Sequence, residues 1–468
     1  MAMEIVDGVK VLGEWRVSPA TAPVPPTEHR LSYFDVEMLT HQVRFLLFFD
    51  FPGSTQDFRD VHFPLLRRSL SLTLSLFYPS AGRLVPSPQG DDRVIRYSDG
   101  DSATITLAES GADFGSLVGN RAKEAEAFHP LVPPLLHVTP TSVSSENEQG
   151  TPLVAFRVTV FPGTGVSIGF TFNHVLTDGT GGMNFLKTWA AVYKAGGDVS
   201  DVVKDLPVFD RAVLRHLEPL KRALMEEPRR LVASLPESEE EPNRTHRMTR
   251  ATFVLKRAHI ETLRSEMMKT GNVGPRISTF AVTCAYVWAC LAKSRPVPKK
   301  ATETDQTLYF GIPANCRHRL LPPVPITYFG NASPVGAVVE ASRTELTREN
   351  GAASAARAIQ AAIRRIDEGN GIILEELTAV GRRWREVVSS TPRERRLCIA
   401  GSPFFRAYDT DFGWGRPRKV EYGLLEHTEF VSLADGREED GGVEIGVGGP
   451  EEEVLRFETF FKEPLRGL

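Results

Sequence analysis

The chain has 468 residues, of which 41% are hydrophobic and 24% are charged. This apolar content is too high for a disordered chain and is enough to build a large buried core, so we expect a globular protein of more than one domain. The 55 basic and 59 acidic residues leave a formal charge of −4 at pH 7, which excludes the strong positive field that attracts nucleic acid or anionic lipid.

No segment is typical of a membrane span or a targeting signal. The longest membrane-like run, from Phe280 to Ala292, is well short of the roughly 20 apolar residues that cross a bilayer. The amino terminus lacks a basic region followed by an apolar one, and the final Arg-Gly-Leu matches neither a prenylation nor a peroxisomal signal. We therefore expect a cytosolic protein without a membrane partner.

The spacing of apolar residues predicts the elements in chain order. A helix is predicted from Pro64 to Tyr78, since proline is tolerated in the first turn and Pro79 stops the helix. Strands from Leu153 to Phe161 and from Val166 to Phe172 are joined by a short glycine-rich loop, which indicates a hairpin. Further along, the pattern predicts an apolar helix, a strand and a closing helix at 277–291, 442–448 and 451–461. Helices and strands alternate without a regular βαβ order, so the sequence predicts a mixed α/β chain.

A proline-rich and acidic stretch from Val202 to Asn243 separates two halves of similar size. Its prolines and its cluster of glutamates at 237–241 indicate a solvated surface crossover rather than a binding site. We predict an N-terminal domain at 1–200, a linker at 201–245 and a C-terminal domain at 246–468. The four cysteines have no C-x-x-C spacing, so we expect buried thiols and neither a disulfide framework nor a metal site at Cys284, Cys290, Cys316 and Cys398.

The segment that follows the second hairpin strand is the most informative for function. His174 falls at the end of this strand, and Asp178 lies in a tight turn before a helix that begins with Gly179-Thr-Gly-Gly. A neutral imidazole at a strand end is well placed to accept a proton near pH 7. The His-x-x-x-Asp spacing alone proves little, because about half a match is expected by chance at an average composition. The alternative is a partly buried histidine that only forms hydrogen bonds within its turn.

Several familiar motifs fail on their context. Gly165 to Gly169 matches G-x-S-x-G, but Ser167 lies inside a predicted strand rather than on a sharp strand-to-helix turn. The glycines near 163 and 179 lack the third glycine of a dinucleotide-binding loop, and they do not form a P-loop. Asp411-Phe-Gly-Trp-Gly415 contains the kinase D-F-G, but no other kinase segment accompanies it. The segment instead indicates a rigid structural loop with its aromatic rings packed inward, formed by Asp411, Gly413, Trp414 and Gly415.

Together, His174-Val-Leu-Thr-Asp178-Gly179 and Asp411-Phe-Gly-Trp-Gly415 resemble the two signature motifs of the plant BAHD acyltransferases. The resemblance runs nearly end to end, since Phe77 to Leu84 is similar to the family's F-Y-P-x-A-G-R-L stretch. Tyr328-Phe-Gly-Asn-Ala332 is similar to its Y-F-G-N-C segment. This segment is similar to the corresponding segment of one branch of the family, the anthocyanin and phenolic-glucoside malonyltransferases, as are residues 31–35, 207–211 and 278–288.

The resemblance implies a fold of two similar domains, each with a chloramphenicol-acetyltransferase-like mixed sheet flanked by helices, and a solvent channel between them. Acyl-CoA would enter this channel from one face as co-substrate, and a hydroxyl acceptor from the other. No permanently bound cofactor, metal or nucleic acid is implied, and we expect a monomer whose partners are small molecules.

The resemblance also implies roles for individual residues. His174 would deprotonate the acceptor hydroxyl and then protonate the leaving CoA thiolate, with direct transfer in a ternary complex. Asp178, the other member of the catalytic motif, could orient the imidazole as in a triad, but in the family it pairs with an arginine, which here would be Arg317. Asn315 stands where the family usually has an aspartate. CoA would be held by Ser278, Thr279, Lys256 and Arg257, and the substrate pocket would include Tyr33, Phe34, Asp35, Ser402 and Phe404.

One departure from the family bears on the acyl donor. Phe404 occupies a position that is commonly basic, whereas a malonyl carboxylate prefers a cation such as arginine. Malonyl-CoA is the favoured donor and a phenolic, flavonoid or anthocyanin glycoside the favoured acceptor, with a hydroxycinnamoyl-CoA transferase as the alternative. A catalytically silent binding relative is a further alternative, against which the intact His174 and Asp178 argue. A peptide-synthetase condensation domain is disfavoured because Asn173 stands where a second histidine is usual there.

Overall fold

The structure is a computed structural model of the chain. It describes residues 5–6, 8–20, 26–87, 92–135, 150–200, 202, 205–226, 247–270, 277–296, 306–368, 374–422, 428–438 and 441–466. The acidic cluster at 237–241 and most of the loop at 142–151 lie outside these residues. No helix in the described part is long and apolar enough to cross a membrane.

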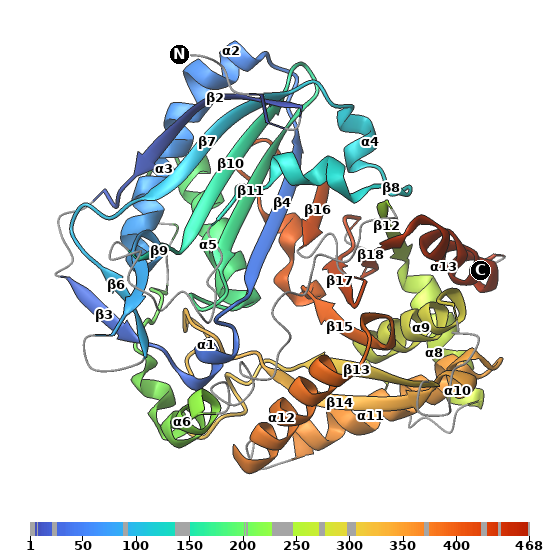
Figure 1. The fold of residues 1–468 in the computed structure, drawn as a ribbon. Helices are drawn as coiled ribbons and strands as arrows, with labels where there is room; N and C mark the ends of the chain where they lie inside the picture. Colours follow the sequence, from blue (N-terminus) through green and yellow to red (C-terminus); the bar gives the residue numbers. More distant parts are fainter. Residues whose placement is uncertain are drawn as a thin grey trace.

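Two seven-stranded mixed sheets form the frame of the molecule (Figure 1). The first sheet has the order β1 (Ile5–Val6), β2 (Val9–Val17), β7 (Ala103–Ser110), β10 (Val154–Phe161), β11 (Gly165–Asn173), β4 (Gln42–Asp50) and β16 (Lys419–Tyr422). The second has the order β14 (Val335–Ser342), β13 (Thr307–Pro313), β15 (Arg396–Ala400), β17 (Phe430–Asp435), β18 (Val443–Pro450), β12 (Met248–Leu255) and β8 (Lys123–Glu124). A smaller sheet consists of β3 (Thr27–Arg30), β6 (Arg93–Tyr97), β5 (Arg83–Pro86) and β9 (Thr151–Pro152).

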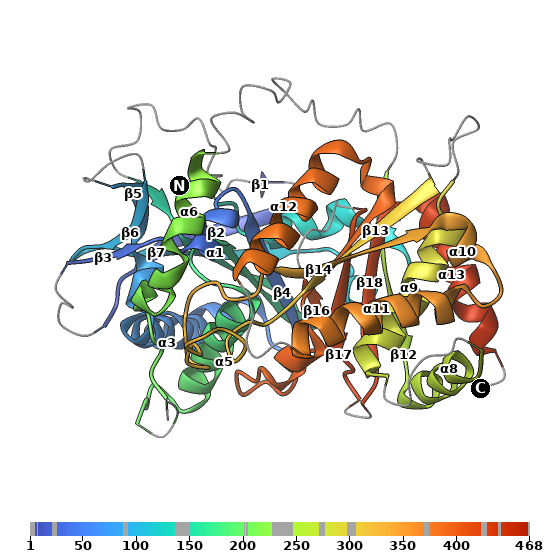
Figure 2. The same ribbon diagram turned by 90° about the horizontal axis from the view of Figure 1, so that it is seen from below.

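Helices cover the outer faces of both large sheets, which lie side by side in Figure 2. In the N-terminal half, α3 (Phe63–Leu76) and α5 (Gly179–Lys194) pack against the first sheet, and the short helices are α1 (Tyr33–Glu37), α2 (Thr55–Asp57) and α4 (Phe114–Val118). In the C-terminal half, the helices are α8 (Arg257–Thr270), α9 (Thr279–Ser294), α10 (Arg343–Thr347), α11 (Gly351–Glu368), α12 (Leu374–Ser390) and α13 (Glu451–Lys462). Each large sheet therefore has its own buried apolar core.

The prediction of a mixed α/β fold is confirmed. The hairpin is β10 and β11, paired antiparallel with Val158 opposite Ile168. The predicted helix at 64–78 is α3, the apolar helix is α9, and the closing strand and helix are β18 and α13. Ser167 lies inside β11 and is fully buried, so it does not form a nucleophile elbow.

The two halves exchange strands, which a division by sequence number alone did not predict. β16 comes from the C-terminal half but pairs with β4 in the first sheet, with Tyr422 opposite Phe45. β8 comes from the N-terminal half and pairs with β12 at the edge of the second sheet. Each sheet is therefore completed by a segment of the other half.

Part of the predicted linker is helical and partly buried. Residues 205–226 contain a 3-10 helix, Arg211–Leu217, followed by α6 (Glu218–Glu226). Their apolar side chains share a core with those of α1, and the buried ones are Leu214, Leu217 and Leu224. The spacing of these leucines places them on one buried face of the segment. The prolines and glutamates of the surrounding sequence instead indicate a loop, so the sequence did not predict this packing.

Candidate active site

His174 and Asp178 lie in the turn between β11 and α5. Val166 and Ile168 of β11 face the core beneath α5, while Thr171 on the other face donates through its hydroxyl to the carbonyl of Pro133 at 2.8 Å. The strand ends at Asn173, and Asp178 is the N-cap of α5, where its carboxylate accepts from the N–H of Gly181 at 3.2 Å. His174 therefore lies in a short turn between the end of β11 and the cap of α5 at Asp178. Because both elements are fixed, the turn determines where the imidazole lies.

The imidazole of His174 forms a hydrogen bond with Asn331 from the other half of the chain. Nδ1 lies 2.9 Å from Oδ1 of Asn331, whose side-chain nitrogen donates to the carbonyl of His174 at 2.7 Å. Asn331 is only 2% exposed, whereas His174 is partly exposed. The motif of the first half is thus completed by the Tyr328–Ala332 segment of the second.

Asp35 determines which way the Asn331 amide faces. Its Oδ1 accepts from the amide nitrogen of Asn331 at 2.8 Å and from the backbone N–H at 3.2 Å. A carboxylate and a carbonyl can only accept, so the nitrogen of Asn331 faces Asp35 and the His174 carbonyl, and its oxygen faces the ring. Nδ1 of His174 must then carry the proton, which leaves Nε2 as the unprotonated nitrogen.

Asp35 is itself held in place by a buried network. Its Oδ2 accepts from the N–H and the hydroxyl of Ser32, both at 2.8 Å, and from Nε of Arg211 at 2.9 Å. Arg211 also donates to the carbonyl of Leu176 at 2.9 Å. The Asp35 carboxylate is fully buried and matched by a buried cation, which is the condition under which an internal charge is tolerated.

Burial lowers the pKa of His174 from its ordinary value of 6.5. The hydrogen bond of the ring with its own backbone, the nearby Asp178 and Asn331 oppose this shift without cancelling it. A lowered pKa keeps the imidazole neutral at pH 7, and a neutral imidazole is the form that accepts a proton.

Asp178 forms a buried ion pair with Arg317. Nη1 and Nη2 of Arg317 donate to the two carboxylate oxygens at 2.8 and 3.0 Å, and the two side chains are 1% and 3% exposed. The N–H of Ala332 at 3.1 Å and the hydroxyl of Ser333 at 2.9 Å donate to the same carboxylate. Burial alone would raise the pKa of Asp178, but the Arg317 guanidinium and these N–H groups hold it below its usual range. This is the pair that the family resemblance implied, and it joins the two halves of the chain.

The Tyr328–Ala332 segment has its shape because Tyr328 folds over Gly330. A side chain at position 330 would place its Cβ 2.5 Å from the hydroxyl of Tyr328. Arg317 also donates to the carbonyls of Tyr328 and Gly330, at 3.0 and 3.3 Å. The glycine therefore lets the chain pass close to the tyrosine ring and deliver Asn331 to His174.

The predicted substrate-pocket residues on α1 are all buried. Tyr33 and Phe34 are 2% and 1% exposed, and the hydroxyl of Tyr33 donates to Oε1 of Glu37 at 2.8 Å. Asp35 belongs to the network behind His174, so its contacts show a positioning arrangement in place of the substrate contact that we expected. Whether Tyr33 and Phe34 touch substrate stays a prediction.

Phe404 extends into solvent, whereas its neighbour Phe405 packs against Gly179 at the start of α5. Phe404 is 90% exposed, and the hydroxyl of Ser402 accepts from its N–H at 3.2 Å. A Cβ at Gly179 would lie 2.7 Å from the ring of Phe405. Phe405, which the sequence did not single out, therefore contacts the start of α5. The predicted roles of Ser402 and Phe404 in the pocket stay predictions.

The predicted CoA residues lie at two helix starts in the C-terminal half. Ser278 caps α9 by accepting from the N–H of Ala281 at 3.1 Å, and the hydroxyl of Thr279 accepts from Arg264 at 3.1 Å. Lys256 and Arg257 are exposed at the junction of β12 and α8. CoA binding by these four residues stays a prediction.

The Asp411–Gly415 loop packs on the N-terminal core. Oδ1 of Asp411 accepts from the N–H groups of Gly413 at 2.7 Å and Gly415 at 3.0 Å, and Oδ2 accepts from Lys194 of α5 at 2.6 Å. Both glycines have a positive φ near 90°, which a residue with a side chain rarely adopts. Trp414 stacks on Phe412 with ring centroids 5.5 Å apart. These contacts fit the structural role that the sequence predicts for the Asp411–Gly415 loop.

Comparison with known proteins gives the class of the protein. The model of the Transferase family matches residues 9–463, nearly the whole chain. The chain therefore belongs to this family, that of the BAHD acyltransferases, and is an acyltransferase.

Individual relatives narrow the resemblance. The chain is 33% identical to the malonyl-coenzyme A:anthocyanin 3-O-glucoside-6''-O-malonyltransferase of Dahlia pinnata, over 99% of each chain. It is 31% identical to the coumaroyl-CoA:anthocyanidin 3-O-glucoside-6''-O-coumaroyltransferase 1 of Arabidopsis thaliana, over 98% of this chain and 97% of the relative. Among solved structures, vinorine synthase shares the fold with a TM-score of 0.69 at 20% identity, over 96% of both chains.

Proposed function

We propose that this protein is an acyl-CoA-dependent O-acyltransferase that transfers a malonyl group to a hydroxyl of a phenolic, flavonoid or anthocyanin glycoside. The observation that carries this proposal is the oriented imidazole of His174, whose Nδ1 is bound to Asn331 and whose Nε2 is left unprotonated. The relatives named above act on anthocyanin or anthocyanidin glucosides, which supports the acceptor class.

In the proposed reaction, Nε2 of His174 takes the proton of the acceptor hydroxyl. The acceptor oxygen forms a bond to the thioester carbon, and the tetrahedral intermediate then breaks its carbon–sulfur bond. The imidazolium returns the proton to the departing CoA thiolate, so no proton is gained or lost overall. A thioester is already activated toward attack by an alcohol, so the transfer can take place directly, without an acyl-enzyme intermediate. The contribution required of His174 is that of a positioned base, which typically accelerates a reaction about 10²–10⁴-fold.

The second candidate is a hydroxycinnamoyl-CoA transferase. If position 404 lines the acyl pocket, Phe404 favours this candidate, because a phenyl ring offers a malonyl carboxylate no cation. The coumaroyltransferase relative of Arabidopsis thaliana supports it equally. The same protein scaffold therefore serves either donor among the relatives, and the donor must be measured.

A donor panel tests both proposals. Purified protein is assayed with malonyl-CoA, coumaroyl-CoA and acetyl-CoA against flavonoid and anthocyanin glucosides, with release of CoA as the readout. His174→Ala should abolish turnover with every donor, whereas His318→Ala, an exposed histidine of the C-terminal half, should not change it. Undiminished CoA release by His174→Ala would disprove the mechanism. A clear preference for coumaroyl-CoA would replace the first proposal with the second.

A further inference from the structure

Residues 208–211 of the predicted linker run alongside the Tyr328–Ala332 segment. Val208 forms a parallel bridge with this segment, in which its N–H donates to the carbonyl of Thr327 at 3.0 Å. Its carbonyl accepts from the N–H of Phe329 at 2.9 Å. The linker therefore adds two backbone hydrogen bonds to the segment that brings an asparagine to the imidazole of the site.

Arg211 contacts two further parts of the site. Its Nε donates to Oδ2 of Asp35 on α1 at 2.9 Å, and its Nη2 donates to the carbonyl of Leu176 at 2.9 Å. Leu176 lies in the turn that holds His174, between β11 and α5. Nη1 donates to the carbonyl of Phe209 at 3.2 Å, which ties the side chain to its own segment. One guanidinium thus connects α1, the turn and the linker.

The positive charge of Arg211 is buried together with the negative charge of Asp35. Burial alone would lower the pKa of Arg211, but the adjacent carboxylate outweighs burial and raises it above its ordinary value. The guanidinium therefore stays charged and balances the carboxylate that it contacts. A buried carboxylate that loses such a partner takes up a proton, because an isolated charge is too costly in the interior.

The charge of Asp35 determines which way the Asn331 amide faces. A charged carboxylate can only accept, so it holds the amide nitrogen and turns the amide oxygen toward Nδ1 of His174. A protonated Asp35 could also donate, and the amide oxygen could then face it. The carbonyl of His174, which accepts from the same amide nitrogen at 2.7 Å, would remain as a second constraint. Loss of the charge therefore weakens the selection of the tautomer without removing it.

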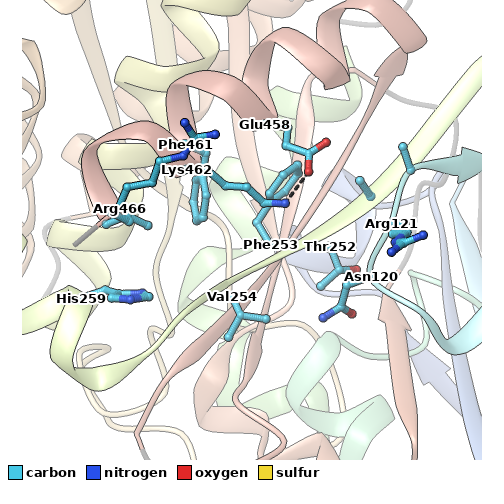
Figure 3. A pocket seen from close by; sticks show the side chains of 13 residues that line it. Asn120, Arg121, Thr252, Phe253, Val254, His259, Glu458, Phe461, Lys462 and Arg466 are labelled. Atoms are coloured by element: carbon cyan, nitrogen blue, oxygen red, sulfur yellow. Dashed lines mark hydrogen bonds and ion pairs between the residues drawn. The ribbon is translucent and has the colours of Figure 1, made fainter. Parts of the chain in front are cut away.

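We propose that Arg211 is a positioning residue of the acyl transfer, which keeps Nε2 of His174 unprotonated by holding the charge of Asp35. The proposal rests on the proposed function, in which that nitrogen takes the proton of the acceptor hydroxyl. None of the residues of this network lines the cleft of about 450 Å³ between β12 and α13 (Figure 3). A change at Arg211 therefore leaves the lining of that cleft as it is.

Lys221 of α6 provides a matched control, because it is a second buried cation of the segment 205–226. It is 3% exposed and pairs with Asp92, just before β6 of the small sheet. Arg211→Gln and Lys221→Gln each keep a hydrogen-bond donor and remove one buried charge, so both should lose stability. Only the first removes the partner of the carboxylate that orients Asn331.

The first measurement is the tautomer of His174, which needs no substrate. The protein carries ¹⁵N-labelled histidine, and the ring signals of His174 are assigned by their absence from His174→Ala. In the wild type and in Lys221→Gln, the nitrogen shifts should place the proton on Nδ1. In Arg211→Gln they should show a mixture of both tautomers. Arg211→Lys keeps the cation and should restore the wild-type pattern.

The second measurement is the release of CoA with the donor that the panel above selects. In Arg211→Gln, kcat should fall roughly tenfold with little change in KM, which is a part of the about 10²–10⁴-fold that a positioned base contributes. Lys221→Gln should keep the wild-type kcat, and Arg211→Lys should recover most of it. A wild type that releases no CoA would refute the proposed function, whereas the tautomer would still test the role of Arg211.

The proposal is overturned if Arg211→Gln shows the wild-type tautomer, or if its kcat is no lower than that of Lys221→Gln. If Arg211→Gln does not fold, Arg211→Gln/Asp35→Asn takes its place, because it removes both buried charges together. An amide at position 35 can donate or accept, so this double variant should show the same mixture of tautomers. The wild-type tautomer in the double variant would equally overturn the proposal.

Discussion

The buried ion pair between Asp178 and Arg317 predicts that Asp178→Asn destabilises the fold, and does not merely slow the reaction. The two side chains are 3% and 1% exposed, and the carboxylate also accepts from Ala332, Ser333 and Gly181. An asparagine would turn an amide nitrogen toward some of these donors and leave the Arg317 charge without a counter-ion. Breaking a buried pair from one side costs about 3–5 kcal/mol, a large part of the roughly 5–15 kcal/mol that stabilises a typical native protein.

Equilibrium unfolding in urea, followed by circular dichroism, measures this loss. Asp50→Asn is the matched control, because Asp50 pairs with Arg418 at 3.2 Å while both side chains are about half exposed, and exposed pairs contribute only about 0–1 kcal/mol. The double variant Asp178→Asn/Arg317→Gln should lose less stability than the sum of the two single variants, because it removes both charges together. The reasoning is refuted if Asp178→Asn is as stable as the wild type but loses its turnover, since Asp178 would then act on the imidazole directly.

The remaining predictions concern the site and its donor. Asn331→Ala removes the acceptor that selects the tautomer of His174, so kcat should fall roughly 10²-fold with little change in KM; wild-type kcat would contradict the orienting role. Since burial places the pKa of His174 below 6.5, the neutral base is lost only as the pH falls through that lower value. The acid limb of a kcat/KM profile should therefore be centred below pH 6.5, and a limb centred above 6.5 would contradict a lowered pKa. Gly330→Ala places a methyl group against Tyr328 and should cost about 1–3 kcal/mol in urea unfolding, whereas unchanged stability would show that the ring moves freely. If position 404 meets the donor, Phe404→Arg should lower the KM for malonyl-CoA and raise that for coumaroyl-CoA; equal KM values would place this exposed ring outside the donor site.

Contiguous patterns predicted the local elements well. The β10–β11 hairpin, α3 and α9 follow from apolar spacing along a single stretch of chain, because each buries a face whose period is set by its own backbone. The linker at 201–245 stays a prediction, but the packing of its leucines in 211–226 into a core does not follow from its prolines and glutamates, which indicate a loop. The acidic remainder lies outside the described residues.

The candidate site was predicted where its residues are close in sequence. His174 and Asp178 lie four residues apart, so a strand end followed by a capped helix brings them into one turn. The role of Asn331 was missed, although the Tyr328–Ala332 segment was recognised as a family motif. An amide-bearing residue in a recognised motif was the available signal, but its hydrogen bond to a residue 157 positions away has no local pattern.

The sequence by itself determined the family, the mixed α/β class and the turn that holds His174 and Asp178, since each rests on neighbouring residues or on motifs that stand intact in the chain. Only the tertiary structure decided which nitrogen of the imidazole is free, because that depends on Asp35 and Asn331, residues 296 positions apart whose side chains share one hydrogen bond. It also decided that β8 of the N-terminal half joins the second sheet and β16 of the C-terminal half joins the first. The reason is that pairing at a sheet edge satisfies backbone groups however far apart the two strands lie along the chain.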